Sequence, residues 1–254
     1  MPSVSVAAHE GLPFMNPLGE AAVERAIATL GLPAGARVVE TGCGSAELLI
    51  RLLERYPDAE GVGVDADPDV IARAERAATA RLAGRRTRLL AVTAEAAAFT
   101  PGRFDLVINV ASSHAHGGFP GALRTLADLA RPGGLVLFGE GFWRRPPSAA
   151  FLDALGGATV DELPLGIDAL EAGAAAVGLE PVAREVASDE DWAAYEETLA
   201  RNAEALGTSD GDAYAAQIHR RRALTDGAST LGFGLITLRR VCGHVADTLR
   251  RSPD

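Results

Sequence analysis

The sequence predicts an α/β protein with a doubly wound, mostly parallel sheet. Short runs rich in Val, Ile and Leu alternate with longer segments rich in Ala, Leu and Arg, which is the pattern of βαβ units. The chain has 254 residues, of which 48% are hydrophobic, enough to bury the core of one large domain without disulfides.

Seven runs are expected to be strands. The run from Phe104 to Val110 is almost continuously apolar, as in a strand buried on both faces. Pro132, Gly133 and Gly134 are expected to form a turn before the fifth strand. The expected strands are 36–40, 61–65, 86–92, 104–110, 135–140, 179–187 and 230–240.

Helices are expected between these strands. Ser45 is a good N-cap, Pro57 stops the helix that it begins, and Pro68 suits the first turn of the next one. The stretch 189–224 is too long for a tight hairpin, so we expect a helical insertion over one end of the sheet. The expected helices are 23–32, 46–56, 68–83, 119–131, 168–177 and 189–224, with a helix and turn in 146–160.

The chain therefore divides into four parts of one domain. We expect an N-terminal helical segment, a sheet core, a helical lid and a final strand with a C-terminal tail. These parts are 1–35, 36–188, 189–228 and 229–254.

Charge and composition exclude several classes of partner. The 24 basic residues, all arginine, face 34 acidic residues, so the formal charge is −10 and a nucleic-acid partner is not expected. Short basic clusters such as Arg250-Arg251 are expected to be solvated faces. No apolar run is long enough for a membrane span, and the N-terminus lacks the pattern of a signal peptide. Cys43 and Cys242 have no metal-ligand spacing, so we expect no metal and a reduced, cytoplasmic chain.

The strongest motif is VVETGCGSAEL at 38–48. Glu40 closes a strand, Gly42 and Gly44 make a tight turn, and a helix begins at once. Glycines let a ligand approach the backbone, and a helix start offers free N–H groups. The dinucleotide fingerprint would need Gly or Ala where Glu47 stands, which argues against NAD.

This run resembles motif I of the class I S-adenosylmethionine-dependent methyltransferases. Glu40, Gly42 and Gly44 are in register, and Ala46 replaces the usual third glycine. The resemblance implies a Rossmann-like sheet of seven strands whose last strand is antiparallel. It covers 20–140 well and is strongest to small bacterial methyltransferases of unassigned substrate. The segments that these share with the chain are NPLGEAAVERAI, GE-x-FW after the fifth strand, and DE-x-W-xx-YE from Asp189 to Glu196.

The resemblance also implies S-adenosylmethionine as cofactor. Glu40 would hold its amino group, Asp65 both ribose hydroxyls, and Glu95 the adenine amino group. A carboxylate such as Asp65 can accept both hydroxyl protons, which is a physical reason for an acid there. The full set of expected cofactor-binding residues is Glu40, Gly42, Cys43, Gly44, Asp65, Ala66, Ala94, Glu95 and Asn109.

The sequence says less about which residues contact the methyl acceptor. A sulfonium methyl is already activated, so transfer needs positioning and a deprotonated nucleophile. His114 follows the fourth strand and is expected to be the base, with Glu140 at the same sheet edge as a second catalytic group. His114, Trp143 and Tyr195 are expected to contact substrate. The alternatives are a hydrogen bond from His114 to loop backbone, a turn-capping role for Glu140 and an anchoring role for Tyr195 in the lid.

We therefore predict a methyltransferase that modifies an oxygen or nitrogen of a small molecule. The alternatives are an NAD(P)-dependent oxidoreductase and a non-catalytic or repurposed S-adenosylmethionine-binding protein. We expect a monomer or homodimer whose partner is the small-molecule acceptor.

Overall fold

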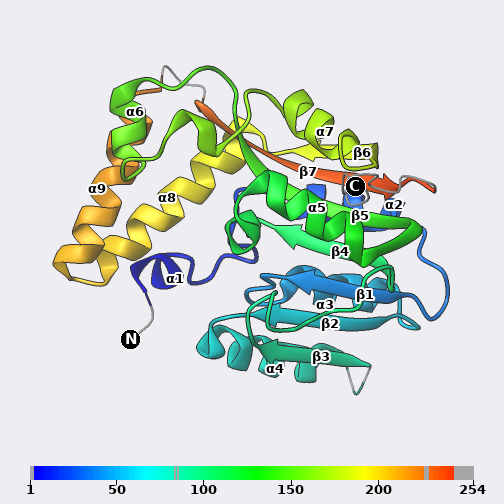
Figure 1. Cartoon of the computed structure of the whole chain (residues 1–254). Helices are drawn as coiled ribbons and strands as arrows, with labels where there is room; N and C mark the ends of the chain where they lie inside the picture. The colour runs from blue at the N-terminus through cyan, green and yellow to red at the C-terminus, as the bar shows by residue number, and fades with distance from the viewer. Residues whose placement is uncertain (1–2, 83, 85, 226–228, 243–254) are drawn as a thin grey trace, which may run out of the picture.

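The computed structural model describes residues 3–82, 84, 86–225 and 229–242. Its centre is a seven-stranded sheet in the order β3-β2-β1-β4-β5-β7-β6, with helices on both faces (Figure 1). The predicted fold class is thus confirmed. The predicted tail beyond residue 242, with its Arg250-Arg251 cluster, lies outside the described residues.

β1 to β5 are parallel to one another, whereas β7 runs in the opposite direction. β7 lies between β5 and β6 and is antiparallel to both. The order turns back at β1, between β2 and β4, and ligands of open α/β sheets bind at such a reversal. The strands are β1 Arg37–Thr41, β2 Glu60–Asp65, β3 Thr87–Ala91, β4 Phe104–Val110, β5 Ala130–Trp143, β6 Leu179–Val186 and β7 Leu231–Arg240.

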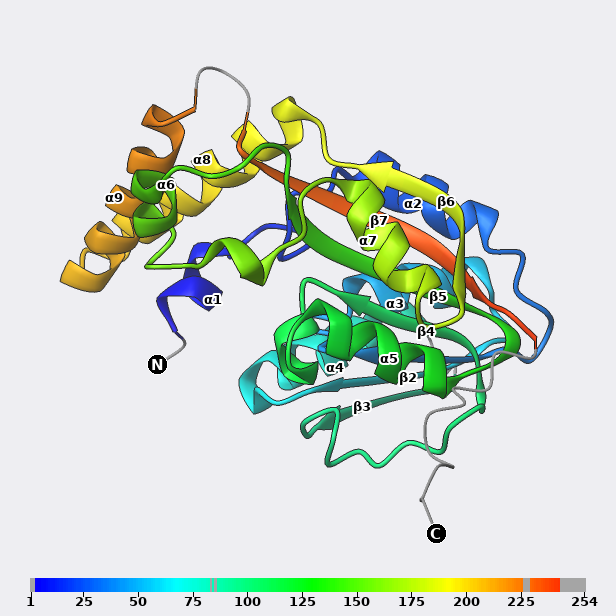
Figure 2. The ribbon, with the colours of Figure 1, turned by 45° about the horizontal axis from the view of Figure 1, so that its top comes forward.

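Two hydrophobic cores hold the layers together. One lies between the sheet and α2, α3 and α4, and the other lies between the sheet and α5 and α7, on the opposite face (Figure 2). α3 faces the first core with Leu49, Leu52 and Leu53, none of which is exposed. The helices of these two layers are α2 Glu20–Thr29, α3 Glu47–Arg55, α4 Pro68–Leu82, α5 Phe119–Leu129 and α7 Ile167–Ala175.

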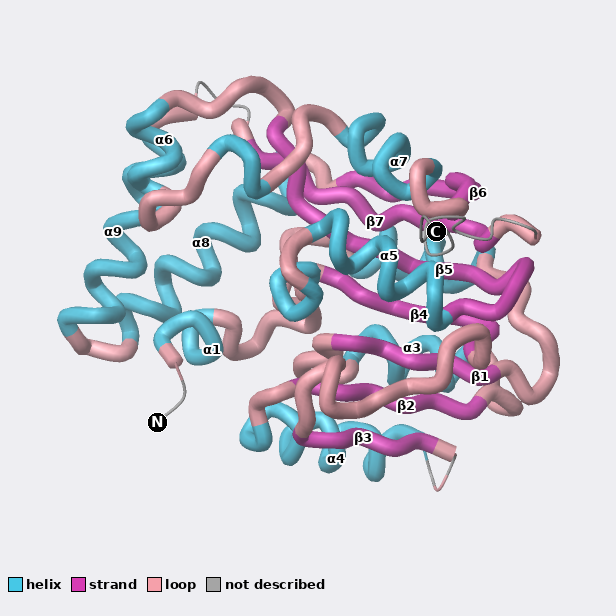
Figure 3. The backbone as a smooth tube through the Cα atoms, viewed as in Figure 1, coloured by secondary structure: helices cyan, strands magenta, loops and turns pink. Residues whose placement is uncertain are grey.

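A third group of helices forms a lid beyond one end of the sheet (Figure 3). α8 and α9 pack on each other through a small alanine-rich core that also includes Ala8 of α1. Asn202 of α8 donates hydrogen bonds to the carbonyls of Ala8 and Glu10, at 3.0 and 2.8 Å, and so ties the N-terminal helix to the lid. The helices are α1 Val4–Ala8, α6 Ala149–Ala154, α8 Asp189–Ala205 and α9 Ser209–Ala223, and two short 3₁₀ helices are η1 Ser113–His116 and η2 Val160–Glu162.

The structure differs from the expected elements in three places. Ser45 is not the N-cap of α3, because Ala46 takes that position with a φ of +56° and no side chain caps the helix. The helical stretch expected over 189–224 is broken at Gly207, whose φ of +62° ends α8. The turn expected at Pro132–Gly134 lies inside β5, which begins at Ala130 and shifts register against β4 there. In the part of the chain that the structure describes, no helix is both long and apolar enough to cross a membrane.

The packing of α3 predicts a stability difference between two leucines. Leu49 is completely buried, whereas Leu206 is 39% exposed. Leu49→Ala is expected to lower the free energy of unfolding by about 2–5 kcal/mol, because it leaves a cavity in the core. Leu206→Ala, the control, is expected to cost less than about 1 kcal/mol. Urea denaturation measures both, and equal losses would contradict the assigned core.

Candidate functional site

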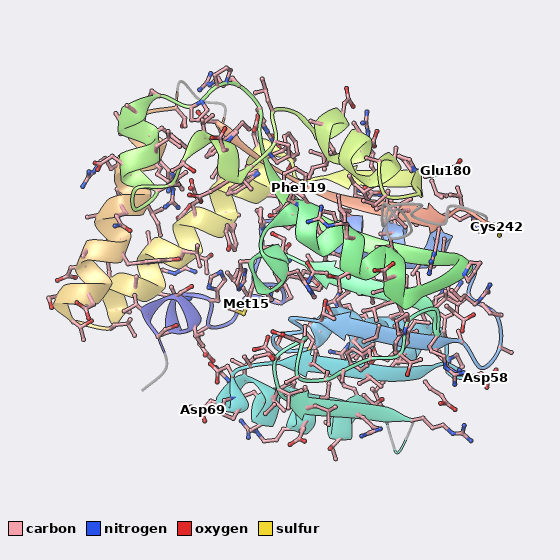
Figure 4. The ribbon with its side chains drawn as sticks, viewed as in Figure 1. Met15, Asp58, Asp69, Phe119, Glu180 and Cys242 are labelled. Carbon is pink, nitrogen blue, oxygen red and sulfur yellow. The ribbon has the colours of Figure 1, made fainter. Side chains whose placement is uncertain are left out.

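A cavity of about 700 Å³ lies where the parallel strands end. Its floor is formed by residues that follow β1, β2, β3 and β4, and its other wall by α1, α8, α9 and the segment after α1. Met15, in that segment, lies between the lid and the strand ends (Figure 4). The cavity is thus lined by parts of the chain that are far apart in the sequence.

The glycine turn after β1 lines this cavity. Gly42 and Gly44 have φ values of +65° and +52°, which glycine adopts without strain. A Cβ on Gly42 would lie only 2.4 Å from the side chain of Ser112, so no larger residue fits there. The Gly44 N–H donates to Asp65 at 2.9 Å, which ties the turn to the end of β2.

Glu40 is a buried acid in the cavity wall. It is only 4% exposed, and among the described residues its Oε2 has no hydrogen-bond partner. Burial raises the pKa of Glu40 to about 8, and the nearby Asp65 acts in the same direction, while the Leu49 N–H opposes them. The free oxygen therefore suits a ligand group that donates a hydrogen bond.

The ends of β2 and β3 place some predicted residues in the cavity and leave one out. Asp65, Ala66 and Ala94 line it, as does Thr93. Asp65 accepts one hydrogen bond on each oxygen, from Gly44 and from Asp67 at 3.0 Å, and each oxygen retains a second lone pair. Glu95 is exposed and does not line the cavity.

Asn109 lies beneath the site and is not part of its wall. It is completely buried, and its amide donates to the Thr41 carbonyl and hydroxyl oxygens at 3.0 Å each. It therefore links the ends of β1 and β4, between which the glycine turn and η1 emerge.

His114 and Glu140 lie close together but differ in access to the cavity. His114, in η1, is exposed and lines the cavity. Glu140, in β5, is buried behind it and accepts a hydrogen bond from the Gly141 N–H at 2.8 Å. Burial raises the pKa of Glu140, against the opposing effects of Ser113, the Gly141 N–H and His114.

Of the two expected aromatic contacts, only one faces the cavity. Tyr195 of α8 lines it and is hydrogen bonded to His9 at 2.7 Å. Trp143 is 1% exposed, and its indole N–H donates to the Val160 carbonyl at 2.8 Å. Its ring packs edge-on against Phe151, so Trp143 holds β5 to its neighbours instead of lining the cavity.

Comparison with known proteins finds a methyltransferase domain. A family profile described as a methyltransferase domain matches residues 38–134, which include the glycine turn and the ends of β2, β3 and β4. The fold matches a SAM-dependent methyltransferase from Thiobacillus denitrificans, crystallised with S-adenosyl-L-homocysteine, with a TM-score of 0.79 and 26% identity. That match covers 94% of this chain and 98% of the other.

Residues 38–134 form a methyltransferase domain, and these matches support a class I S-adenosylmethionine-dependent methyltransferase.

Two sequence relatives were found, one of them named a methyltransferase. The methyltransferase is 27% identical to the uncharacterized protein YjhP of Escherichia coli over 85% of this chain and 90% of the relative. It is 35% identical to a demethylmenaquinone methyltransferase of Thermus thermophilus over 45% of this chain and 50% of that one. The latter match is confined to about half of either protein, so it does not identify the acceptor.

The match to a methyltransferase domain argues against the alternative of an NAD(P)-dependent oxidoreductase. The position of Glu47 gives a physical reason. Glu47 lines the cavity in the first turn of α3 and forms ion pairs with Arg51 and Arg81, at 2.6 Å each. A pyrophosphate at this helix start would meet a carboxylate.

Several lining residues of the methyltransferase were not predicted from sequence. Ser112 and Thr93 follow the same strands as the predicted residues, so their positions after β4 and β3 were the available signal. The sequence signal was weaker for Tyr214 and for the segment after α1. In that segment the apolar run LPFMNPL precedes the first core helix without belonging to it. These unpredicted residues are Phe14, Met15, Leu18, Thr93, Ser112 and Tyr214.

The raised pKa of Glu40 predicts that the free energy of unfolding of the ligand-free methyltransferase depends on pH. In the unfolded chain this carboxyl loses its proton near pH 4.5, but in the folded protein only near pH 8. Unfolding therefore releases a proton between these values, and stability falls as the pH rises through the window. Glu40→Gln stays neutral and is expected to match the wild type near pH 5 and to exceed it at pH 8 by on the order of a few kcal/mol.

Urea denaturation at pH 5, 6.5 and 8 without added nucleotide measures this difference. Glu95→Gln is the control, because Glu95 is exposed and should not change the pH dependence. Parallel pH profiles of the wild type and Glu40→Gln would contradict the assigned state of Glu40.

Proposed function

We propose that the protein transfers a methyl group from S-adenosylmethionine to an oxygen or nitrogen of a small molecule held in the cavity beneath the lid. One observation carries this proposal: the glycine turn with Asp65 on one side, and His114 with Tyr195 on the other, line a single cavity. When bound, S-adenosylmethionine supplies a methyl group already activated on a sulfonium sulfur.

The chain's residues fit this cofactor. Glu40 presents a buried oxygen without a partner, which we assign to the cofactor's amino group. Gly42, Cys43 and Gly44 form a cradle that a Cβ on Gly42 would fill, and we assign it to the methionyl part. The free lone pairs of Asp65 suit the two ribose hydroxyls.

The adenine end is assigned to the residues after β2 and β3. Ala66 and Ala94 line the cavity there, and we propose that they pack against the adenine ring. Glu95 is exposed outside the cavity, so its expected bond to the adenine amino group would require a change of side-chain position. Asn109 supports the site from below by joining β1 to β4.

On the acceptor side, we propose that His114 takes the proton of the nucleophile. Its imidazole is exposed to the cavity and makes no hydrogen bond to another described residue that would occupy it. Glu140 lies close enough for a charge interaction with His114, so it would stabilise the imidazolium that forms. Trp143 is buried away from the cavity and is assigned to holding β5.

The partner is a small-molecule acceptor. The formal charge of −10 argues against nucleic acid, and we retain a monomer or homodimer as the proposed state. Among the described residues, no three His, Cys, Asp or Glu side chains lie together as a metal site would require.

Calorimetric titration of the full chain with S-adenosylmethionine, S-adenosylhomocysteine, NAD and NADP tests the first step. Micromolar binding of the two sulfur nucleotides alone is expected. Transfer is then tested with a labelled methyl group and a panel of hydroxyl and amine compounds. Binding without transfer to any compound would favour the repurposed cofactor-binding protein, and binding of a nicotinamide nucleotide alone would overturn the proposal.

The assigned role of Asp65 predicts a loss of cofactor affinity. Asp65→Asn keeps the volume but removes the charge that accepts the hydroxyl protons and the Gly44 N–H, so the Kd for S-adenosylhomocysteine is expected to rise at least tenfold. Asp69→Asn is the matched control, since Asp69 is exposed in the first turn of α4 and outside the cavity. Calorimetry measures both, and similar affinities for the two variants would remove Asp65 from the site.

The assigned role of His114 predicts a loss of rate without a loss of cofactor binding. His114→Ala is expected to bind S-adenosylhomocysteine within twofold of the wild type and to transfer methyl groups at least tenfold more slowly. Single-turnover transfer to an acceptor found in the panel measures the rate. A wild-type rate would end the assignment of His114 as the base.

A further inference from the structure

The lid end of the cavity contains a hydrogen-bonded pair whose proton positions are fixed by its surroundings. His9 Nδ1 lies 2.6 Å from the Ser5 carbonyl oxygen, which can only accept, so Nδ1 carries the hydrogen. Burial lowers the pKa of His9, which favours the neutral ring. Nε2 then has no hydrogen and must accept from the Tyr195 hydroxyl, 2.7 Å away.

The Tyr195 oxygen therefore offers the cavity only lone pairs. Its single hydrogen is used in the bond to His9, and burial raises the pKa of Tyr195, so the phenol stays protonated. Because both Tyr195 and His9 line the cavity, a ligand that reaches this oxygen must bring its own hydrogen. A carboxylate or phosphate oxygen facing Tyr195 would meet lone pairs instead.

The charges around the cavity also disfavour an anionic acceptor. The carboxylates of Glu47 and Asp65 line it, Glu40 adds a protonated carboxyl, and in the described part of the chain no arginine lines it. Arg221 of α9 is near enough to affect the pKa of Tyr195, but it is paired with Glu196 at 3.2 Å in a largely buried ion pair. An anionic acceptor would thus lose its hydration without gaining a cation.

Arg51 is likewise already paired with carboxylates. Its guanidinium lies over the Phe14 ring, which lines the cavity, at 5.2 Å from the ring centre. It forms ion pairs with Glu20, Glu24 and Glu47, at 2.5, 3.0 and 2.6 Å. These three carboxylates compensate its charge, so it adds no anion site to the cavity wall.

We propose that His9 and Tyr195 form the acceptor subsite, and that this subsite selects a neutral or cationic acceptor that donates a hydrogen bond to the Tyr195 oxygen from a hydroxyl or amine hydrogen other than the one that His114 removes. Carboxylate and phosphate groups are rejected there. In this arrangement Tyr195 touches the acceptor, and His9 is a positioning residue that decides the direction of the Tyr195 hydroxyl. The inference rests on the proposed function, since it names the substrate class of the same cavity.

The test uses compounds that share a carbon skeleton and differ in one group. Benzyl alcohol, benzylamine and benzoate, with the cyclohexylmethyl alcohol, amine and carboxylate, are titrated into the full chain saturated with S-adenosylhomocysteine, and binding is followed by ligand-observed NMR. The alcohols and amines are expected to bind at least tenfold more tightly than the carboxylates. Carboxylates that bind equally well, or alcohols and amines that all fail to bind, would overturn the subsite.

Two variants separate a role in recognition from a role in structure. Tyr195→Phe removes only the oxygen and is expected to weaken alcohol and amine binding at least fivefold. His9→Phe keeps a ring but removes the group that accepts the Tyr195 hydrogen, so the hydroxyl is free to donate. Carboxylate affinity is then expected to increase at least fivefold, a gain that damage to the fold would not produce.

A conservative variant and a remote one complete the design. His9→Gln retains an oxygen that can accept from Tyr195, so it is expected to keep the rejection of carboxylates. Tyr56→Phe removes a phenol that donates to the Ile27 carbonyl, and neither residue lines the cavity, so it should leave the selectivity unchanged. Unchanged selectivity in both Tyr195→Phe and His9→Phe would overturn the proposal.

The cofactor titration keeps the two proposals apart. Loss of S-adenosylhomocysteine binding in the wild type would remove the proposed function itself. Normal S-adenosylhomocysteine binding with no preference among the compounds would remove only the acceptor subsite.

Discussion

The hydrogen bond from the Gly44 N–H to the Asp65 carboxylate is the interaction on which the site depends. It joins the turn after β1 to the end of β2, and the Cys43 N–H adds a second link to the Val64 carbonyl at 2.9 Å. With both strand ends held, Glu40, the glycine cradle and Asp65 face the same space. The chain accepts strain to maintain this turn, because Ala46 adopts a φ of +56° that glycine would adopt more readily.

The lid side of the site is held in place by a different set of contacts. Its residues come from α1, α8 and α9, whose small shared core is separate from the two cores of the sheet. The sheet therefore supplies the residues that we assign to the cofactor, and the lid supplies Tyr195, which we assign to the acceptor. This division explains why the family is clear from the glycine turn while the acceptor is not.

Predictability from the sequence follows the same division. The strands and the core helices could be predicted, because alternation of apolar runs with capped helices is a local signal, and Glu40, Gly42 and Asp65 stand at strand ends where parallel sheets bind ligands. Strand position alone could not tell that Asn109 and Trp143 face the interior, where hydrogen bonds to Thr41 and Val160 hold them. The hydrogen bond between His9 and Tyr195 joins residues 186 positions apart, and no local sequence pattern predicts such a contact.

That span has a consequence for the protein during its synthesis. The residues assigned to the cofactor all precede position 110, so they leave the ribosome before Tyr195 and Tyr214 of the lid. β7, which fills the place between β5 and β6, comes later still. A nascent chain that has already made its glycine turn thus has neither a lid nor a complete sheet. The site is therefore complete only after α8, α9 and β7 have been synthesised.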